Sequence, residues 1–222
     1  MDNLISITIP SYNGEKYIAE CIKSIQSQKV NTEIIVIDDI SSDKTVEIAK
    51  SLGAKVFVNK HHKGQVAGKN EGIKHSKGDY WLTIDQDDML REGALLRLLD
   101  EINKDKSIKI VMAKLQDFCS SNFEENQRFC KPQPFRGILT GSTLFRISVF
   151  KEIGLFREDL ITGDVIDLTT RLSSKSIQIK YIDFISCDRR IHESNYGRTN
   201  QKNEYKDYAK LLRSRINSKL NK

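Results

Sequence analysis

Residues 78–90 read Gly78-Asp79-Tyr80-Trp81-Leu82-Thr83-Ile84-Asp85-Gln86-Asp87-Asp88-Met89-Leu90. An apolar run lies here between a Gly-Asp turn signal and three carboxylates within four positions, which predicts a buried strand with acids at its C-terminal tip. Carboxylate oxygens suit Mg²⁺ or Mn²⁺, and these ions commonly bind together with nucleotide phosphates. The other interpretation is an acidic turn that caps a helix beginning near Gly93.

The composition is that of a globular protein, with 38% hydrophobic and 30% charged residues in 222 positions. This length is enough for one sizeable domain. Because no run is apolar enough for a membrane span and the first residues lack a secretion-signal pattern, we expect a cytoplasmic protein. The cysteines are widely spaced and form no Cys-x-x-Cys pair, so we expect reduced thiols rather than a zinc site or disulfides at Cys21, Cys119, Cys130 and Cys187.

The formal net charge of +6 fits an anionic ligand, although the basic residues are spread along the chain and become denser near its end. A nucleic-acid-binding protein would need a basic face with interleaved aromatic residues or a recognisable module. Neither pattern is found, so we expect no nucleic-acid partner.

Strands and helices are predicted to alternate through the first ninety residues. Apolar runs predict strands at 4–9, 33–37, 55–58 and 80–84, and three-to-four spacing predicts helices at 17–28, 41–52 and 66–75. Right-handed crossovers would make a parallel sheet, which binds ligands at the carboxyl ends of its strands. Tyr12, Asp38, Asp39 and the Asp85 group all fall on that edge, which favours a functional interpretation of the acids.

The second half is predicted to contain further strands, helices and a long loop. We expect helices at 93–103, near Ser148 and at 164–174, strands at 108–113 and 141–146, a loop at 119–136, and two paired strands at 177–182 and 184–186. The tail at 205–219 is predicted to be a basic amphipathic helix that packs on the domain. A partner protein or an anionic membrane surface is the alternative site for it.

Four motifs resemble, in order and spacing, those of family 2 glycosyltransferases: Ile7–Asn13, Ile35–Thr45, Gly68–Gly72 and Leu82–Asp88. Two later segments, 141–146 and 190–195, are similar to the family's second half. The resemblance implies an α/β protein with the GT-A fold, a Rossmann-like and mostly parallel central sheet flanked by helices. It implies a single catalytic domain over 1–200, with a nucleotide-sugar-binding half to about 104 and an acceptor-binding half from about 105, followed by a basic C-terminal helix at 201–222.

The implied activity is inverting transfer of a sugar from a nucleotide-diphosphate sugar, expected to be a UDP-sugar, with Mn²⁺ or Mg²⁺. The acceptor, whether saccharide, lipid or peptide, is not identified by the sequence. A homodimer and peripheral contact with the inner face of the membrane are both compatible with the chain. Two alternatives are a catalytically impaired nucleotide-binding or scaffold homologue and a nucleotidyltransferase, although the Gly-rich, Arg-containing loop of the latter is absent.

The resemblance also assigns residues to the donor site. Metal ligands would be Asp85, Asp87 and His192. Lys69 stands where the family often has arginine, and a lysine keeps the charge but loses the bidentate geometry. The nucleotide-sugar contacts would come from Pro10, Ser11, Tyr12, Asn13, Asp38, Asp39, Lys69, Asn70, Asp85, Gln86 and Arg190.

Two departures from the family pattern concern the nucleotide motif and the base. Ile40 replaces the usual glycine after Asp39, and Val165 stands where an acid is common, so Asp164 or Asp167 must act as base. We assign proton removal from the acceptor to Asp164, and leaving-group stabilisation to the ion on Asp87 with help from His192 or Arg190. Helix capping is the alternative role for Asp164, and a structural hydrogen bond is the alternative for His192.

Overall fold

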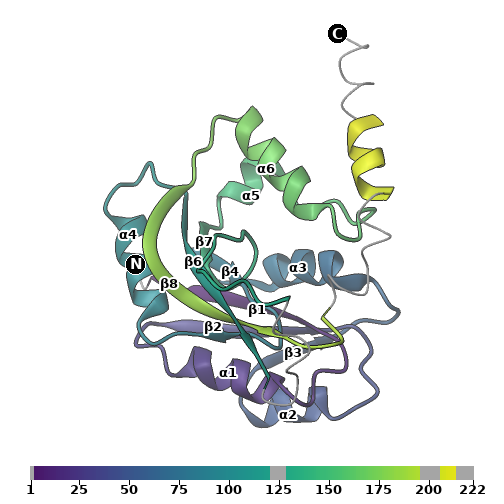
Figure 1. Ribbon diagram of the computed structural model, residues 1–222. Helices are drawn as coiled ribbons and strands as arrows, with labels where there is room; N and C mark the ends of the chain where they lie inside the picture. Colours follow the sequence, from purple (N-terminus) through teal and green to yellow (C-terminus); the bar gives the residue numbers. More distant parts are fainter. Residues whose placement is uncertain (1–2, 121–128, 196–205, 214–222) are drawn as a thin grey trace.

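The computed structural model describes residues 3–120, 129–195 and 206–213. Within these residues one eight-stranded sheet has the order β3-β2-β1-β4-β7-β6-β8-β5 (Figure 1). Its strands are β1 (Ile5–Ser11), β2 (Thr32–Asp38), β3 (Lys55–Val58), β4 (Tyr80–Thr83), β5 (Met89–Leu90), β6 (Ile110–Cys119), β7 (Thr143–Arg146) and β8 (Lys180–Ile191). The helices are α1 (Ile18–Gln26), α2 (Thr45–Ser51), α3 (Gly64–His75), α4 (Ala94–Asn103), α5 (Val149–Ile153) and α6 (Asp164–Ser174).

The first four strands form the predicted parallel sheet. β1 lies between β2 and β4 and is parallel to both, with Ile7 beside Ile34 and Leu82. β1 continues past the predicted end at Ile9, because the Ser11 carbonyl accepts a hydrogen bond from the Asp39 N–H. The carboxyl ends of β1, β2 and β4 therefore meet at one edge, as the alternation of strands and helices predicts.

The second half of the sheet is mixed. β7 is antiparallel to both β4 and β6, whereas β8 is parallel to β6 and antiparallel to β5. The prediction of two paired strands at 177–182 and 184–186 is wrong, because the structure has the single strand β8. Asp183, which interrupts the apolar pattern, is exposed and pairs with Lys114, so a charged residue breaks the periodicity without breaking the strand.

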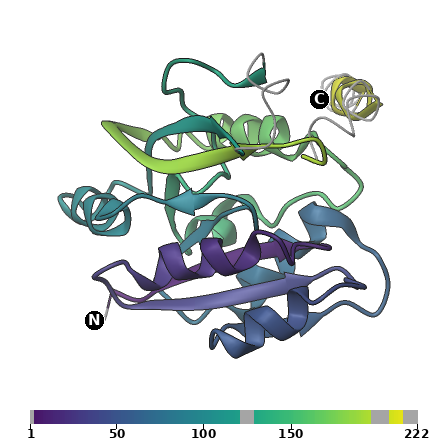
Figure 2. The same ribbon diagram turned by 60° about the horizontal axis from the view of Figure 1, so that its bottom comes forward.

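The core lies on both faces of the sheet, and alternate strand residues point to opposite faces. On one face Leu82 and Leu144 pack with α1 and α4, and on the other Trp81 and Phe145 pack with α3, α5 and α6. Figure 2 shows helices on both sides of the sheet. Each fully buried large apolar side chain contributes roughly 1.5–3 kcal/mol of transfer free energy, so both faces stabilise the sheet that carries the cleft.

Two cysteines depart from the expectation of reduced thiols. Cys119 and Cys130 form a disulfide, whereas Cys21 and Cys187 are buried free thiols. The chain turns back along β6, where Phe135 and Leu115 exchange backbone hydrogen bonds of 2.8 and 3.0 Å, and this reversal returns Cys130 to Cys119. Cysteine spacing alone cannot reveal such a return. Residues 121–128 of the predicted loop lie outside the described residues.

Residues 206–213 form a helix, which is the described part of the predicted C-terminal helix. Leu211 in this helix is buried, whereas the neighbouring Leu212 is 58% exposed. Figure 1 shows this helix beside the segment that leads into α6. Among the helices of the described ranges, none has the length and apolarity needed to cross a membrane.

Candidate active site

A cleft of about 1290 Å³ opens at the carboxyl ends of β1, β2 and β4, and α6 contributes to its opposite wall. Both the acidic strand tip of β4 and the start of α6 reach it. The predicted site residues that line the cleft are Pro10, Ser11, Tyr12, Asn13, Asp39, Lys69, Asp85, Gln86, Asp87, Asp164 and His192. The predicted Asp38, Asn70, Asp167 and Arg190 lie outside this lining.

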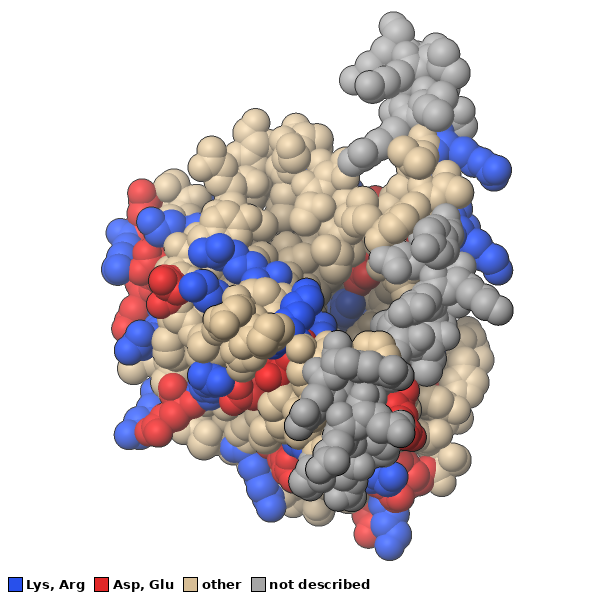
Figure 3. All heavy atoms as spheres, viewed as in Figure 1, with Lys and Arg blue, Asp and Glu red and all other residues tan. Residues whose placement is uncertain are grey.

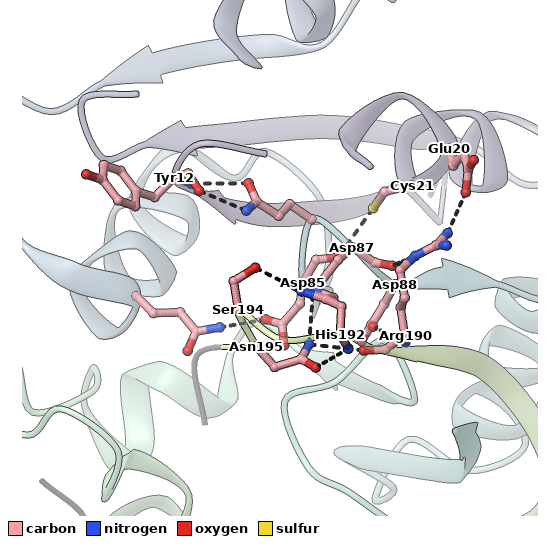
Figure 4. Close-up of polar contacts among 12 residues, drawn as sticks. Tyr12, Glu20, Cys21, Asp85, Asp87, Asp88, Arg190, His192, Ser194 and Asn195 are labelled. Atoms are coloured by element: carbon pink, nitrogen blue, oxygen red, sulfur yellow. Dashed lines mark hydrogen bonds and ion pairs between the residues drawn. The ribbon is translucent and has the colours of Figure 1, made fainter. Parts of the chain in front are cut away.

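Gln86 holds the loop after β1. Its Oε1 accepts hydrogen bonds from the Ser11 hydroxyl at 2.5 Å and the Tyr12 N–H at 3.1 Å, and its Nε2 donates to the Tyr12 carbonyl at 3.0 Å. The Tyr12 side chain stays 50% exposed, and Figure 4 shows its ring pointing away from the acidic cluster. The loop therefore presents an aromatic surface on which a flat base can stack.

Ile40, in the turn after β2, stands where the family pattern has glycine. Ile40 has φ +66°, a left-handed conformation that costs a residue other than glycine roughly 1–2 kcal/mol. The buried Asp38 carboxylate accepts hydrogen bonds from the Ser41 N–H and hydroxyl, which holds this turn in place. Asp38 thus shapes the turn from behind the cleft.

Asp39 points into the cleft from the same turn. Burial acts to raise the pKa of this carboxyl, but the Lys63 N–H, the Asn59 amide and the Gly64 N–H outweigh it and lower the pKa. Asp39 therefore remains a hydrogen-bond acceptor at neutral pH.

Three carboxylates crowd the tip of β4. Asp85 Oδ1 accepts a hydrogen bond from the Gln65 amide at 2.6 Å, and burial together with the charge of Asp87 raises the pKa of Asp85 to about 6. Burial, followed by Asp87 and Asp85, raises the pKa of Asp88 well above its ordinary value. One Asp88 oxygen accepts the Arg190 N–H at 3.0 Å, while Oδ2 is buried without a hydrogen-bond partner among the described residues. A cation would relieve this excess of negative charge.

His192, directly after β8, contacts Asp87 in the cleft. Its Nε2 lies 2.6 Å from Asp87 Oδ2, and its Nδ1 lies 3.0 Å from the Ser194 hydroxyl. The Asn195 amide donates to the same Asp87 oxygen at 3.1 Å. Figure 4 shows these side chains converging.

The side chains of the described residues do not by themselves form a metal site. Within the described residues, no cluster of three or more His, Cys, Asp or Glu side chains is arranged to hold an ion. Mg²⁺ commonly binds through one or two carboxylates while phosphate oxygens supply further ligands. Asp87 and His192, with the crowded Asp85 beside them, fit an ion that is shared with a diphosphate rather than one held by protein alone.

Arg190 lies outside the cleft lining and contacts the backbone of the acidic segment after β4. Its guanidinium donates to the Asp87 carbonyl at 3.0 Å and to Glu20 at 2.5 Å, as Figure 4 shows. Its side chain also lies over the Tyr17 and Phe118 rings. The adjacent Arg189 lines the cleft instead.

Lys69 and Asp164 form an ion pair at the opposite wall. Lys69 Nζ lies 2.6 Å from Asp164 Oδ2, and both side chains are buried. Asp167 lies one turn further along α6, where it pairs with Arg171 at 2.8 Å outside the cleft. Asn70 exchanges hydrogen bonds with the Phe156 backbone and so ties α3 to the segment before α6.

Several cleft residues were not predicted from the sequence. Gln65 contacts Asp85, Asn195 contacts Asp87, and Arg189 and Tyr17 also line the cleft. Asn195 could have been found from the sequence, because it lies in the family-like segment 190–195, three positions after His192. Gln65 has no comparable signal, because it reaches Asp85 only through the packing of α3 on the sheet.

Comparison with known proteins identifies the family. The profile for Glycosyl transferase family 2 matches residues 6–162. An uncharacterized glycosyltransferase of Rickettsia typhi is 33% identical over 220 residues, which cover 91% of this chain and 69% of the relative.

Two solved structures share the fold. Residues 1–349 of S. aureus TarS, in complex with UDP-GlcNAc, give a TM-score of 0.66 at 22% identity, and the match covers 86% of this chain and 60% of that TarS chain. The mannosyltransferase PcManGT of Pyrobaculum calidifontis, in complex with GDP-Man and Mn²⁺, has a TM-score of 0.70 at 15% identity, covering 95% of this chain and 64% of that one. The chain thus spans less than two thirds of either solved protein. The predicted GT-A fold is confirmed, and the chain belongs to glycosyl transferase family 2.

Proposed function

We propose that the protein transfers a sugar, with inversion, from a nucleotide-diphosphate sugar to an acceptor hydroxyl or amine. The observation that carries this proposal is that one cleft holds an acidic end, at Asp85 and Asp87, and a separate carboxylate at its opposite wall, Asp164. Inverting transfer needs two such ends, because the acceptor attacks the anomeric carbon opposite the departing diphosphate. The donors bound to TarS and PcManGT support a nucleotide sugar, and we take a UDP-sugar as the first to test.

The donor would lie along the carboxyl edge of the sheet. Tyr12 offers a ring to the base, and Asp39 offers carboxylate oxygens to ribose hydroxyls. Asp87 and His192 would hold Mn²⁺ or Mg²⁺ beside the diphosphate. The ion, when bound, offsets the negative charge of the leaving group.

Asp164 would be the base. As the acceptor oxygen or nitrogen forms its bond to the anomeric carbon, the bond from that carbon to the diphosphate breaks, and the acceptor's proton passes to Asp164. The contact with Lys69 at 2.6 Å fixes the Asp164 carboxylate at the cleft wall, and proximity supplies much of the effect of a general base. Asp167 is disfavoured because it faces Arg171 outside the cleft.

The catalytically impaired homologue is the second candidate. It is favoured by Val165, which lines the cleft with a side chain 36% exposed at the position where the family pattern carries an acid. An impaired homologue would bind UDP yet turn over no donor. A nucleotidyltransferase is disfavoured by the family match.

The test is a screen of nucleotide sugars for thermal stabilisation with and without Mn²⁺. A ligand at a hundredfold its Kd stabilises the folded state by about 2.7 kcal/mol, so the preferred donor should raise the melting temperature. The metal-dependent part should be lost in Asp87→Ala and kept in Asp183→Ala, which changes an exposed acid. Hydrolysis and transfer assays with that donor follow. If no nucleotide sugar stabilises the protein with or without metal, the proposal is wrong.

A further inference from the structure

One carboxylate from the C-terminal helix binds the turn that precedes Asp164. Asp207 Oδ2 accepts hydrogen bonds from three consecutive backbone N–H groups, at 2.6 Å from Ile161, 2.7 Å from Thr162 and 3.1 Å from Gly163. Consecutive N–H groups that surround an anion form a strong binding concavity. Asp207 is only 1% exposed, so water cannot replace it as acceptor without a local rearrangement.

The helix and the turn are so close together that the turn has no room for a side chain at Gly163. A Cβ at Gly163 would lie 2.9 Å from the Asp207 Cβ and 3.4 Å from a Leu211 methyl carbon. Lys210 adds a second tie by donating to the Asp159 carbonyl at 2.6 Å. The helix therefore fits this turn through a specific contact.

The same turn is a wall of the cleft. Ile161, Thr162, Asp164 and Val165 all line it, and Gly163 is the residue before the first turn of α6. Asp207 binds the backbone N–H groups of this turn. Its carboxylate therefore fixes the position at which α6 starts, and with it the backbone of Asp164.

We infer that Asp207 is a positioning residue for Asp164 and, from the helix of residues 206–213, completes the acceptor side of the active site. This inference rests on the proposed function, in which Asp164 is the base. Asp207 contacts the turn, and the hydrogen bonds of its carboxylate lie away from Asp85 and Asp87, which we call the proposed donor end. Its loss should therefore lower kcat while donor binding is kept.

The first test is a comparison of kcat and donor KM in Asp207→Ala, Asp207→Asn and the wild type, with the donor found by the screen. A displacement of about 1 Å can cost on the order of 100-fold in rate, so we expect Asp207→Ala to lose about 10-fold to 100-fold in kcat. Donor KM and UDP affinity should change less than twofold. Asp207→Asn keeps one oxygen that can accept from the turn and should recover part of the rate. Leu212→Ala, on the exposed side of the same helix, is the matched control and should behave as wild type.

Gly163→Ala probes the same contact from the other side, in case Asp207→Ala does not fold. It should also lower kcat at unchanged donor KM. A wild-type kcat in Asp207→Ala, or an equal loss of kcat and UDP affinity, overturns the inference.

Amide hydrogen exchange tests the contact without activity. In Asp207→Ala the amides of Ile161, Thr162 and Gly163 should exchange at least tenfold faster, while those of β1 are unchanged. If the wild type turns over no donor, the proposed function fails, and this exchange result then decides whether Asp207 orders the turn. Unchanged exchange at the three amides overturns that part as well.

Discussion

The two ends of the cleft are built in different ways. At the proposed donor end Asp85 and Asp87 are two positions apart, directly after β4, and a single further segment brings His192 to Asp87. At the acceptor end Lys69, Asp164 and Asp207 come from three segments separated by tens of residues. The donor end is thus encoded largely in local sequence, whereas the acceptor end exists only once the chain has folded.

The two ends also differ in charge balance. Burial, followed by the charge of the neighbouring Asp87, raises the pKa of Asp85 to about 6. The Asp164 carboxylate, by contrast, has the Lys69 ammonium 2.6 Å away. An added cation would therefore favour the charged form of Asp85 at the proposed donor end, whereas Asp164 at the proposed acceptor end already has Lys69 as its partner.

The largest effect is expected from Asp87→Ala. This change removes the carboxylate that meets His192, and with it the group best placed to share an ion with a diphosphate. Metal ions stabilise developing charge by several kcal/mol, so we expect a loss of about 1000-fold in kcat/KM for donor hydrolysis or transfer. Full activity in this variant at saturating Mn²⁺ would refute the assignment of the donor end. Asp183→Ala is the control for the loss of one acid from the surface.

A comparison of Asp164→Asn with Asp167→Asn separates the two candidate bases. General base catalysis contributes roughly 100-fold to 10,000-fold, and we expect Asp164→Asn to lose about 100-fold to 1000-fold in kcat, the lower part of that range, while UDP affinity is retained. Asp167→Asn disturbs the pair with Arg171 outside the cleft and should keep kcat within a few fold. The measurement is steady-state transfer with UDP binding by calorimetry. The reverse order of effects would make Asp167 the base.

The sequence predicts those features of the fold that follow from local patterns of apolar and turn residues. Apolar runs and turn residues predicted β1 to β4, and their common carboxyl edge predicted that Asp39, Asp85 and Asp87 share a cleft. The start of α6 at Asp164 was also predicted. The strands and the start of α6 depend on residues within a few positions of one another, and the shared cleft follows from the regular alternation of strands and helices.

The sequence does not predict contacts between residues that are brought together only by the path of the folded chain. The return along β6 that forms the disulfide of Cys119 and Cys130 has no local signal. Arg190 belongs to a motif, yet its guanidinium turns toward Glu20 because β8 alternates its side chains between faces. Asp207 was one acid in a basic tail, and only the fold brings it to the turn before Asp164.

Lys69→Met distinguishes two roles for the lysine. The family resemblance suggests phosphate contact, which predicts a higher donor KM, whereas the geometry pairs Lys69 with Asp164, which predicts a lower kcat. A buried hydrogen bond between charged groups contributes about 1.5–3 kcal/mol, so we expect roughly a 10-fold to 100-fold fall in kcat with little change in KM. Lys74→Met, on the same helix and outside the cleft, is the control. A rise in donor KM alone would place Lys69 at the donor end.

The smallest effect is expected from Glu33, a buried acid near the amino ends of the parallel strands. This edge of the sheet lies opposite the cleft, and Glu33 is not among the cleft residues. Glu33 accepts hydrogen bonds from the Ser6 hydroxyl, the Lys55 ammonium and the Lys77 N–H. Burial acts to raise its pKa, but these partners, beginning with Lys55, lower it below the ordinary value of 4.5. The charged carboxylate therefore stabilises the fold above about pH 4.5, and this contribution is lost as the pH falls through the lowered pKa.

Glu33→Gln should thus reduce the free energy of unfolding by about 1–2 kcal/mol at pH 7, and by less as the pH is lowered below 4.5. Urea denaturation at both pH values measures the difference. Glu152→Gln, which alters an exposed pair with Lys109, should change stability by about 0.5 kcal/mol or less. Because Glu33 lies at the edge opposite the cleft, kcat and donor KM should stay at wild-type values. An equal loss of stability at both pH values would show that the packing of Glu33, rather than its charge, stabilises this edge. A change in kcat would show that the two edges of the sheet are coupled.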